Sequence, residues 1–132
     1  MNLRLAVAIL AVPVLPAFLL PLMAEVGAAT GQRVEAVRLI HQEATHHGVS
    51  TWQMLRVAWC VSRLDPAAYN PQGDTAGLFQ FTTETWLRVH GSYPGGPPVL
   101  RLPSRFDAQA NARAAAYLMA RPGGWTHWRA CW

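Results

Sequence analysis

The stretch from Ala58 to Phe81, AWCVSRLDPAAYNPQGDTAGLFQF, decides how the rest of the chain is interpreted. It begins with the apolar end of a helix, and Pro66 predicts where that helix stops. Short segments follow, ending in the apolar Gly77 to Phe81, and they are separated by the turn formers Asn70-Pro71, Gly73-Asp74 and Gly77. This pattern predicts a helix end that leads into a small irregular β-hairpin.

The helix before this stretch has a clear predicted start. Ser50 and Gln53 have the spacing of a capping box, so the helix is expected to begin at about Thr51. Its apolar residues cover more than one face and predict a central, largely buried helix. They are Trp52, Met54, Leu55, Val57, Ala58 and Trp59.

An earlier amphipathic helix is predicted to end at Gly48. Its apolar line comprises Val34, Val37, Ile40 or His41, and Ala44. Glu35 and Glu43 are interpreted as solvated helix charges. His41, His46 and His47 match no zinc-ligand spacing and are interpreted as a solvated helix terminus, so no metal site is predicted.

The N-terminus has the pattern of a secretory signal peptide. Arg4 precedes an apolar run from Leu5 to Met23, and the small residues at 26–29 follow it. We therefore expect residues 1–29 to be a cleaved leader and residues 30–132 to be one domain. An uncleaved anchor helix is the alternative, although prolines at positions 13, 16 and 21 disfavour a regular spanning helix.

Two further helices are predicted after the hairpin. Thr82 or Thr83 caps the first, which carries Glu84 in its first turn and ends near Gly91. Residues 92–103 are rich in proline and glycine and predict an irregular exposed loop. Ser104 or Asp107 then caps an alanine-rich helix that is expected to run to position 121. The predicted fold class is α+β, mainly α.

The chain has two cysteines, Cys60 and Cys131, and an exported context would permit a disulfide between them. Two unpaired buried thiols are the alternative. The formal net charge is +4, and every basic residue is an arginine. This excess favours anionic surfaces, but the arginines are spread along the chain, which argues against nucleic acid as a partner.

The order of these pieces resembles the exported, lysozyme-like lytic transglycosylases of the SLT type. The matching pieces are the capped helix ending in Cys-X-Ser, the Asn/Pro turn, Gly-Leu-Phe-Gln, Phe-Asp…Ala-Asn, Ala-Ala-Tyr-Leu and the terminal Gly-Gly-Trp…Cys. The resemblance covers nearly all of residues 30–132. It implies a lysozyme-like fold with a groove for peptidoglycan glycan strands, no cofactor, and a secreted, cell-wall or periplasmic monomer. Lasting membrane insertion is not expected once the leader is cleaved. The residues that would line or shape the groove are Ser62, Gly77, Phe79, Gln80 and Tyr117.

The sequence departs from this family at Val61, where the resemblance places the only catalytic glutamate. In that family one protonated glutamate protonates the leaving oxygen and then acts as a base. Valine has no proton to donate, and losing general acid catalysis typically costs about 10²- to 10⁴-fold in rate. The resemblance therefore implies a domain that binds glycan strands with lost or much reduced cleavage of the MurNAc-GlcNAc β-1,4 bond.

Three alternatives stay open. Asp74 on the hairpin could supply the acid of an active enzyme, although a turn-stabilising role is the simpler interpretation. The scaffold could instead serve as an exported interaction module without catalysis. Val61 could also be a natural variant, a sequencing error or an engineered change. Among the six tryptophans, Trp86 or Trp125 is the candidate for stacking on sugar faces, and the others are expected in the core.

Overall fold

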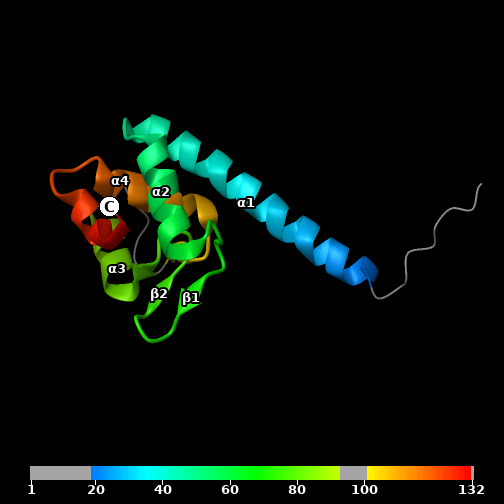
Figure 1. Ribbon diagram of the computed structural model, residues 1–132. Coiled ribbons are helices and arrows are strands. Elements are labelled where there is room, and N and C mark those ends of the chain that lie inside the picture. The colour runs from blue at the N-terminus through cyan, green and yellow to red at the C-terminus, as the bar shows by residue number, and fades with distance from the viewer. Residues whose placement is uncertain (1–18, 93–100, 132) are drawn as a thin grey trace, which may run out of the picture.

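The computed structural model describes residues 19–92 and 101–131, with side chains from residue 24 onward. It is mainly helical with one small antiparallel sheet, which confirms the predicted fold class at this level (Figure 1). The helices are α1 (Leu19–His47), α2 (Thr51–Ser62), α3 (Thr83–Gly91), α4 (Ala108–Met119) and the 3-10 helix η2 (Gly124–Cys131). The strands are β1 (Tyr69–Asn70), β2 (Thr75–Ala76) and β3 (Phe81–Thr82).

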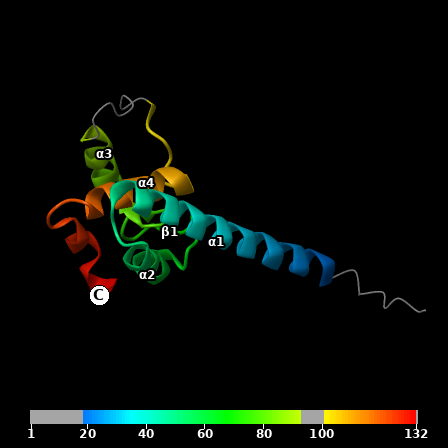
Figure 2. The ribbon, with the colours of Figure 1, turned by 90° about the horizontal axis from the view of Figure 1, so that it is seen from above.

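Helix α1 is longer than the sequence predicted, and its first part extends away from the other elements (Figures 1 and 2). The predicted end of the leader, after residue 29, lies inside α1. Cleavage of the leader there stays a prediction. The second part packs on α4 and α2 through Ala36, Ile40 and Ala44. Val34 and Val37 are exposed, so the predicted apolar line was wrong at these two positions. The packed face of α1 is shifted from the predicted line because it includes the small Ala36 in place of Val34 and Val37.

Glu43 is buried, which corrects its interpretation as a solvated charge. Its carboxylate lies 3.3 Å from Arg113 Nη2 and 3.9 Å from His47 Nε2. Burying a carboxylate without a partner would cost several kcal/mol or more. Arg113 comes from α4, seventy positions further along the chain, so local sequence could not reveal this ion pair.

Helix α2 begins as predicted, because the Ser50 side chain accepts a hydrogen bond from Gln53 N at 3.3 Å. Its packed face consists of Met54, Val57, Ala58 and Ser62. Trp52 is 74% exposed and Trp59 is 50% exposed, so the prediction of a largely buried helix was wrong. The helix ends where Arg63 adopts a left-handed conformation with φ 57°, three residues before Pro66.

The sheet has the order β1-β2-β3, with Tyr69 opposite Ala76 and Ala76 opposite Phe81. Helix α3 follows β3 directly, with Thr82 as its cap. Asp107 caps α4, whose last residue is Met119 and not position 121 as predicted. Most of the predicted loop at 92–103 lies outside the described residues.

The core is formed by residues of α1, α2, α3, α4 and η2 and of the β2–β3 segment. Phe79 and Phe81 contact Trp128 edge-on, with ring centroids 5.9 and 5.8 Å apart. Trp86 is buried and its Nε1 donates to Pro103 O at 3.1 Å. Trp86 is therefore a core residue and not the sugar platform considered from sequence, while Trp125 is partly buried against the core.

A disulfide joins Cys60 at the end of α2 to Cys131 at the end of η2, which confirms the predicted pairing. It ties the C-terminal helix to α2 across 71 positions of sequence. Disulfides persist mainly in oxidising compartments, so the bond is consistent with export. Among the helices of the described residues, we find none with the length and apolar character that crossing a membrane requires.

Candidate functional site

The turn from Gly77 to Gln80 is hydrogen-bonded to α2, α4 and η2. Its backbone groups bond to side chains of three separate elements. Leu78 O accepts from Ser62 Oγ at 2.7 Å, and Phe79 N donates to Asn111 Oδ1 at 2.7 Å. On the other side Phe79 O accepts from Trp128 Nε1 at 2.9 Å. Buried backbone groups need such partners, so this network fixes the turn relative to α2, α4 and η2.

Gly77 is required by two features of this turn. Its φ is 82°, a left-handed conformation that residues with a Cβ adopt at a cost. A Cβ at this position would also overlap the carbonyl oxygen of Arg105 and the amide nitrogen of Asn111. The glycine therefore lets the turn approach the start of α4 closely.

We expect Gly77→Ala to lower the free energy of unfolding by about 2 to 4 kcal/mol, the sum of overpacking and backbone strain. Urea denaturation followed by circular dichroism measures this. Gly73→Ala is the matched control, because its nearest neighbouring atom would be 3.6 Å from the new Cβ and its φ is not positive. Equal midpoints for the two variants would contradict the expectation.

Gln80 also has a left-handed backbone, with φ 53°. Its Nε2 donates to Gly77 O at 2.9 Å and Ala68 O at 3.0 Å, and its Oε1 accepts from Thr75 Oγ1 at 2.8 Å. These bonds hold the side chain across the sheet. Strained non-glycine residues cluster at functional sites, and they persist only when surrounding bonds hold them.

A hollow of about 180 Å³ lies beside Gln80, between the sheet, the start of α3 and η2. The residues that line it are Thr75, Gln80, Phe81, Thr82, Thr85, His127 and Trp128. Hydroxyl, amide and imidazole groups therefore stand next to two aromatic rings. Among these described lining residues there is no carboxylate. The hollow can accept a neutral polar ligand with an apolar face, but its lining offers no carboxylic acid for proton transfer.

The imidazole of His127 is the one titratable group of this lining whose pKa is shifted. Burial, and then the positive charge of Arg88, lower the pKa of His127 below its ordinary value. The ring is consequently neutral at pH 7, with one nitrogen donating and the other accepting. A neutral imidazole can bind a sugar hydroxyl in either direction.

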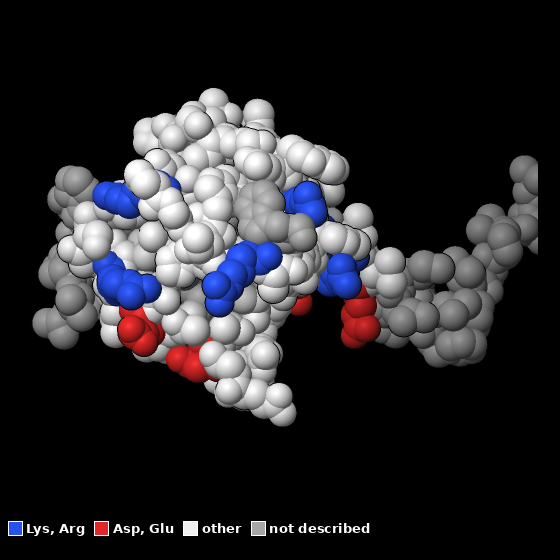
Figure 3. Space-filling view, turned by 60° about the vertical axis from the view of Figure 1, so that its left-hand side comes forward, with Lys and Arg blue, Asp and Glu red and all other residues white. Residues whose placement is uncertain are grey.

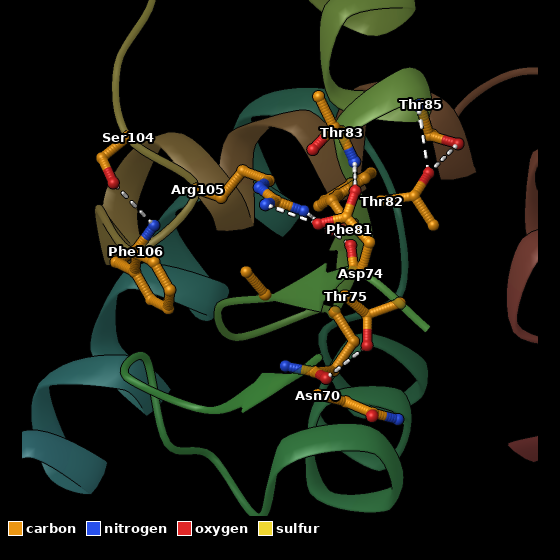
Figure 4. Close-up of polar contacts among 12 residues, drawn as sticks. Asn70, Asp74, Thr75, Phe81, Thr82, Thr83, Thr85, Ser104, Arg105 and Phe106 are labelled. Atoms are coloured by element: carbon orange, nitrogen blue, oxygen red, sulfur yellow. Dashed lines mark hydrogen bonds and ion pairs between the residues drawn. The ribbon is translucent and has the colours of Figure 1, made fainter. Parts of the chain in front are cut away.

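Asp74 lies on the turn between β1 and β2 and is held by two partners (Figure 4). Its Oδ1 is 3.0 Å from Arg105 Nη2, and its Oδ2 accepts from Thr83 N at 3.2 Å. Hydrogen bonds from Thr83 and then from Arg105 lower the pKa of Asp74 below its ordinary value. A carboxyl group that stays ionised is poorly suited to donate a proton at neutral pH. The geometry favours a role in joining the β1–β2 turn to α3 and the segment before α4.

The other sequence candidates occupy different surroundings. Val61 is half-buried and packs against the core, and it is not among the lining residues of the hollow. Ser62, Gly77 and Phe79 are buried, so a ligand would meet the surface that they shape and not their atoms.

Tyr117 donates its hydroxyl to Ser92 O at 2.7 Å, and the Arg121 guanidinium lies 3.4 Å from its ring centroid. Of the five proposed groove residues, the structure brings only Gln80 to the hollow.

Sequence reasoning missed Arg105, Thr85, His127 and the bonding role of Asn111. Arg105 Nη1 donates to Asp74 O at 2.7 Å and Phe81 O at 2.9 Å, joining the β1–β2 turn to strand β3. Asn111 belongs to the Ala-Asn pair that was noticed as a motif, so a signal for it existed. No local pattern marks Arg105 or His127. The partners of the Arg105 guanidinium lie 24 and 31 positions away, and His127 lines the hollow with residues of the sheet and of α3.

Comparison with known protein families, curated proteins and solved structures finds no match. Within the described residues, no group of three or more His, Cys, Asp and Glu side chains could hold a metal ion.

Proposed function

We propose that this chain is an exported, lysozyme-like domain that binds peptidoglycan glycan strands and cleaves them poorly or not at all. The family expectation comes from the sequence motifs around Val61 and the Gly77–Gln80 turn. The observation that supports binding is the hollow beside Gln80. Its hydroxyl groups and the exposed His127 imidazole suit sugar hydroxyls. Phe81 and Trp128 are buried and form its apolar floor.

Weak or absent cleavage is supported by the lining of the same hollow, which contains no carboxylate among the described residues. The family mechanism needs a protonated acid beside the glycosidic oxygen, and Val61 cannot supply one. Asp74, the substitute considered from sequence, is ion-paired with Arg105, and its pKa is lowered. An active enzyme with Asp74 as its acid is thus the less favoured candidate.

Co-sedimentation of the purified protein with insoluble peptidoglycan tests the binding. We expect wild-type protein to pellet with the wall and His127→Ala to bind several-fold more weakly, on the scale of one lost hydrogen bond. His41→Ala is the matched control, because this exposed histidine lies on α1 and outside the hollow.

Two outcomes would contradict the proposal. A protein that stays in the supernatant would favour an interaction module unrelated to the wall. Wild-type protein that releases anhydro-sugar products in a zymogram at ordinary enzyme rates would overturn the expectation of poor cleavage.

A further inference from the structure

Helix α2 and the residue that follows it carry an unusual exposed surface, which we call the Trp/Arg stripe: Trp52, Arg56, Trp59 and Arg63. Trp52, Arg56 and Trp59 follow the spacing i, i+4 and i+7, which places them along one line of α2. Arg63 is the left-handed residue that directly follows the helix. All four are exposed. Tryptophan is highly buried on average, so two exposed indoles on one line require an explanation.

The stripe is an ordered surface and not a set of unrelated side chains. The Arg63 guanidinium lies over the Trp59 ring, 5.3 Å from its centroid, and Arg63 Nη1 approaches Trp59 O at 3.5 Å. Cys60, next to Trp59, is bonded to Cys131, so the helix is tied to η2 beside the stripe. Two indoles seven residues apart stand about 10.5 Å apart along a helix axis.

We propose that the Trp/Arg stripe is a second glycan-binding surface, separate from the hollow beside Gln80, that takes an acidic polysaccharide. The indole rings would stack on sugars about one disaccharide apart, and the guanidinium groups would bind carboxylates. Peptidoglycan fits this chemistry, because its strands are β-1,4-linked amino sugars that carry carboxylates on their substituents. The identification of this polysaccharide as peptidoglycan rests on the proposed function. The proposal that the stripe binds an acidic polysaccharide does not.

The composition of the stripe favours a glycan over a membrane. A helix that lies in a membrane interface has an apolar face opposite its basic face. Here Arg56 lies between the two tryptophans along that line, and the Arg63 guanidinium lies over the Trp59 ring, so no continuous apolar face is available for insertion. Nucleic acid is also disfavoured, because the arginines visible in Figure 3 are dispersed over the surface and do not form one continuous basic track.

The test compares apparent dissociation constants for insoluble peptidoglycan in the full-length protein. The double variant Trp52→Ala/Trp59→Ala is expected to bind about ten-fold more weakly or worse, as the loss of two aromatic contacts implies. Leu87→Ala, an exposed apolar residue on α3, is the matched control. Trp52 is mostly exposed and Trp59 is half-exposed beside Arg63, so the double variant should stay folded at the temperature of the binding assay, with a melting temperature lowered by only a few degrees.

The contribution of the stripe's arginines is measured separately, as the salt dependence of binding. Arg56→Gln should weaken binding and reduce its dependence on salt, whereas Arg33→Gln, an equal charge change at an exposed position of α1, should leave that dependence nearly unchanged. Vesicles of phosphatidylglycerol and a single-stranded oligothymidine serve as competing ligands. The inference would be overturned if the protein bound either of them more tightly than peptidoglycan and the Trp52→Ala/Trp59→Ala variant lost that binding.

The failures of the two proposals are distinguishable. If wild type binds the wall and the Trp52→Ala/Trp59→Ala variant binds equally well, the stripe proposal is overturned and the proposed function stands. If the stripe variant loses binding and His127→Ala does not, the hollow is excluded as the main site and the stripe is supported. If wild type does not bind the wall at all, both proposals fall.

Discussion

Replacing Val61 with glutamate is expected to give the protein measurable wall-lytic activity, about 10² to 10⁴ times the wild-type rate. Val61 is half-buried and packs against the core at the end of α2, outside the lining of the hollow. This outcome therefore requires the glycan strand to extend from the hollow to the end of α2, as the family resemblance implies. Partial burial disfavours the ionised form of a carboxyl group, so the pKa of a glutamate placed here should be raised. A raised pKa keeps part of the population protonated near neutral pH, as donation to a glycosidic oxygen requires.

The measurement is the release of soluble anhydro-muropeptides from purified walls, followed by mass spectrometry. Val61→Gln is the matched control, because glutamine has nearly the same shape as glutamate and no acidic proton. We expect the glutamine variant to bind the wall and remain inactive. A folded Val61→Glu protein that binds the wall but releases no product would show that more than the acid is missing from this site.

Removing the disulfide is expected to lower the free energy of unfolding by roughly 3 to 5 kcal/mol on the chain-entropy account. Cys60 and Cys131 are 71 positions apart, so without the bond the unfolded chain gains much conformational freedom. A domain of this size has about 5 to 15 kcal/mol of total stability, so the loss is a large fraction of it. The bond also ties η2, which contributes His127 and Trp128 to the hollow.

Urea denaturation of Cys60→Ser/Cys131→Ser against wild type measures the effect. Mutating both cysteines avoids a free thiol that could form bonds between molecules. Wild type in a thiol reductant should shift by a similar amount, which separates the loss of the bond from the effect of the serines. The serine variant should also bind the wall more weakly. A shift below about 1 kcal/mol would mean that the denatured state is already compact without the bond.

The limits of the helices were largely predictable from sequence, because helix caps are local. Ser50, Thr82 and Asp107 each accept a hydrogen bond from a backbone N–H three residues later, and a short window of sequence contains both partners. Gly48 ends α1 with a φ of 68° for an equally local reason. The start of α1 was missed because helical residues continue upstream into the segment interpreted as a leader.

The buried faces were predicted less well, because burial depends on elements far away in the chain. Val34 resembles a core residue in the sequence pattern, yet it is exposed, because α1 packs on its neighbours through Ala36, Ile40 and Ala44. Glu43 resembles a surface residue, yet Arg113 of α4 compensates its charge in the interior. Trp52 and Trp59 are apolar but exposed, because no element covers that line of α2 within the described residues.

Helix caps, tight turns, the cysteine pair and the valine at position 61 were readable from the residues along the chain. These depend on residue identity, on bonds that span three or four residues, or on there being only two cysteines to pair. The tertiary structure alone decided that Ser62, Asn111 and Trp128 fix the Gly77–Gln80 turn, which side chains line the hollow, and which tryptophans face solvent. Those features depend on close packing between segments 16 to 49 residues apart, and no local pattern encodes which distant side chain will supply a buried backbone group with its partner.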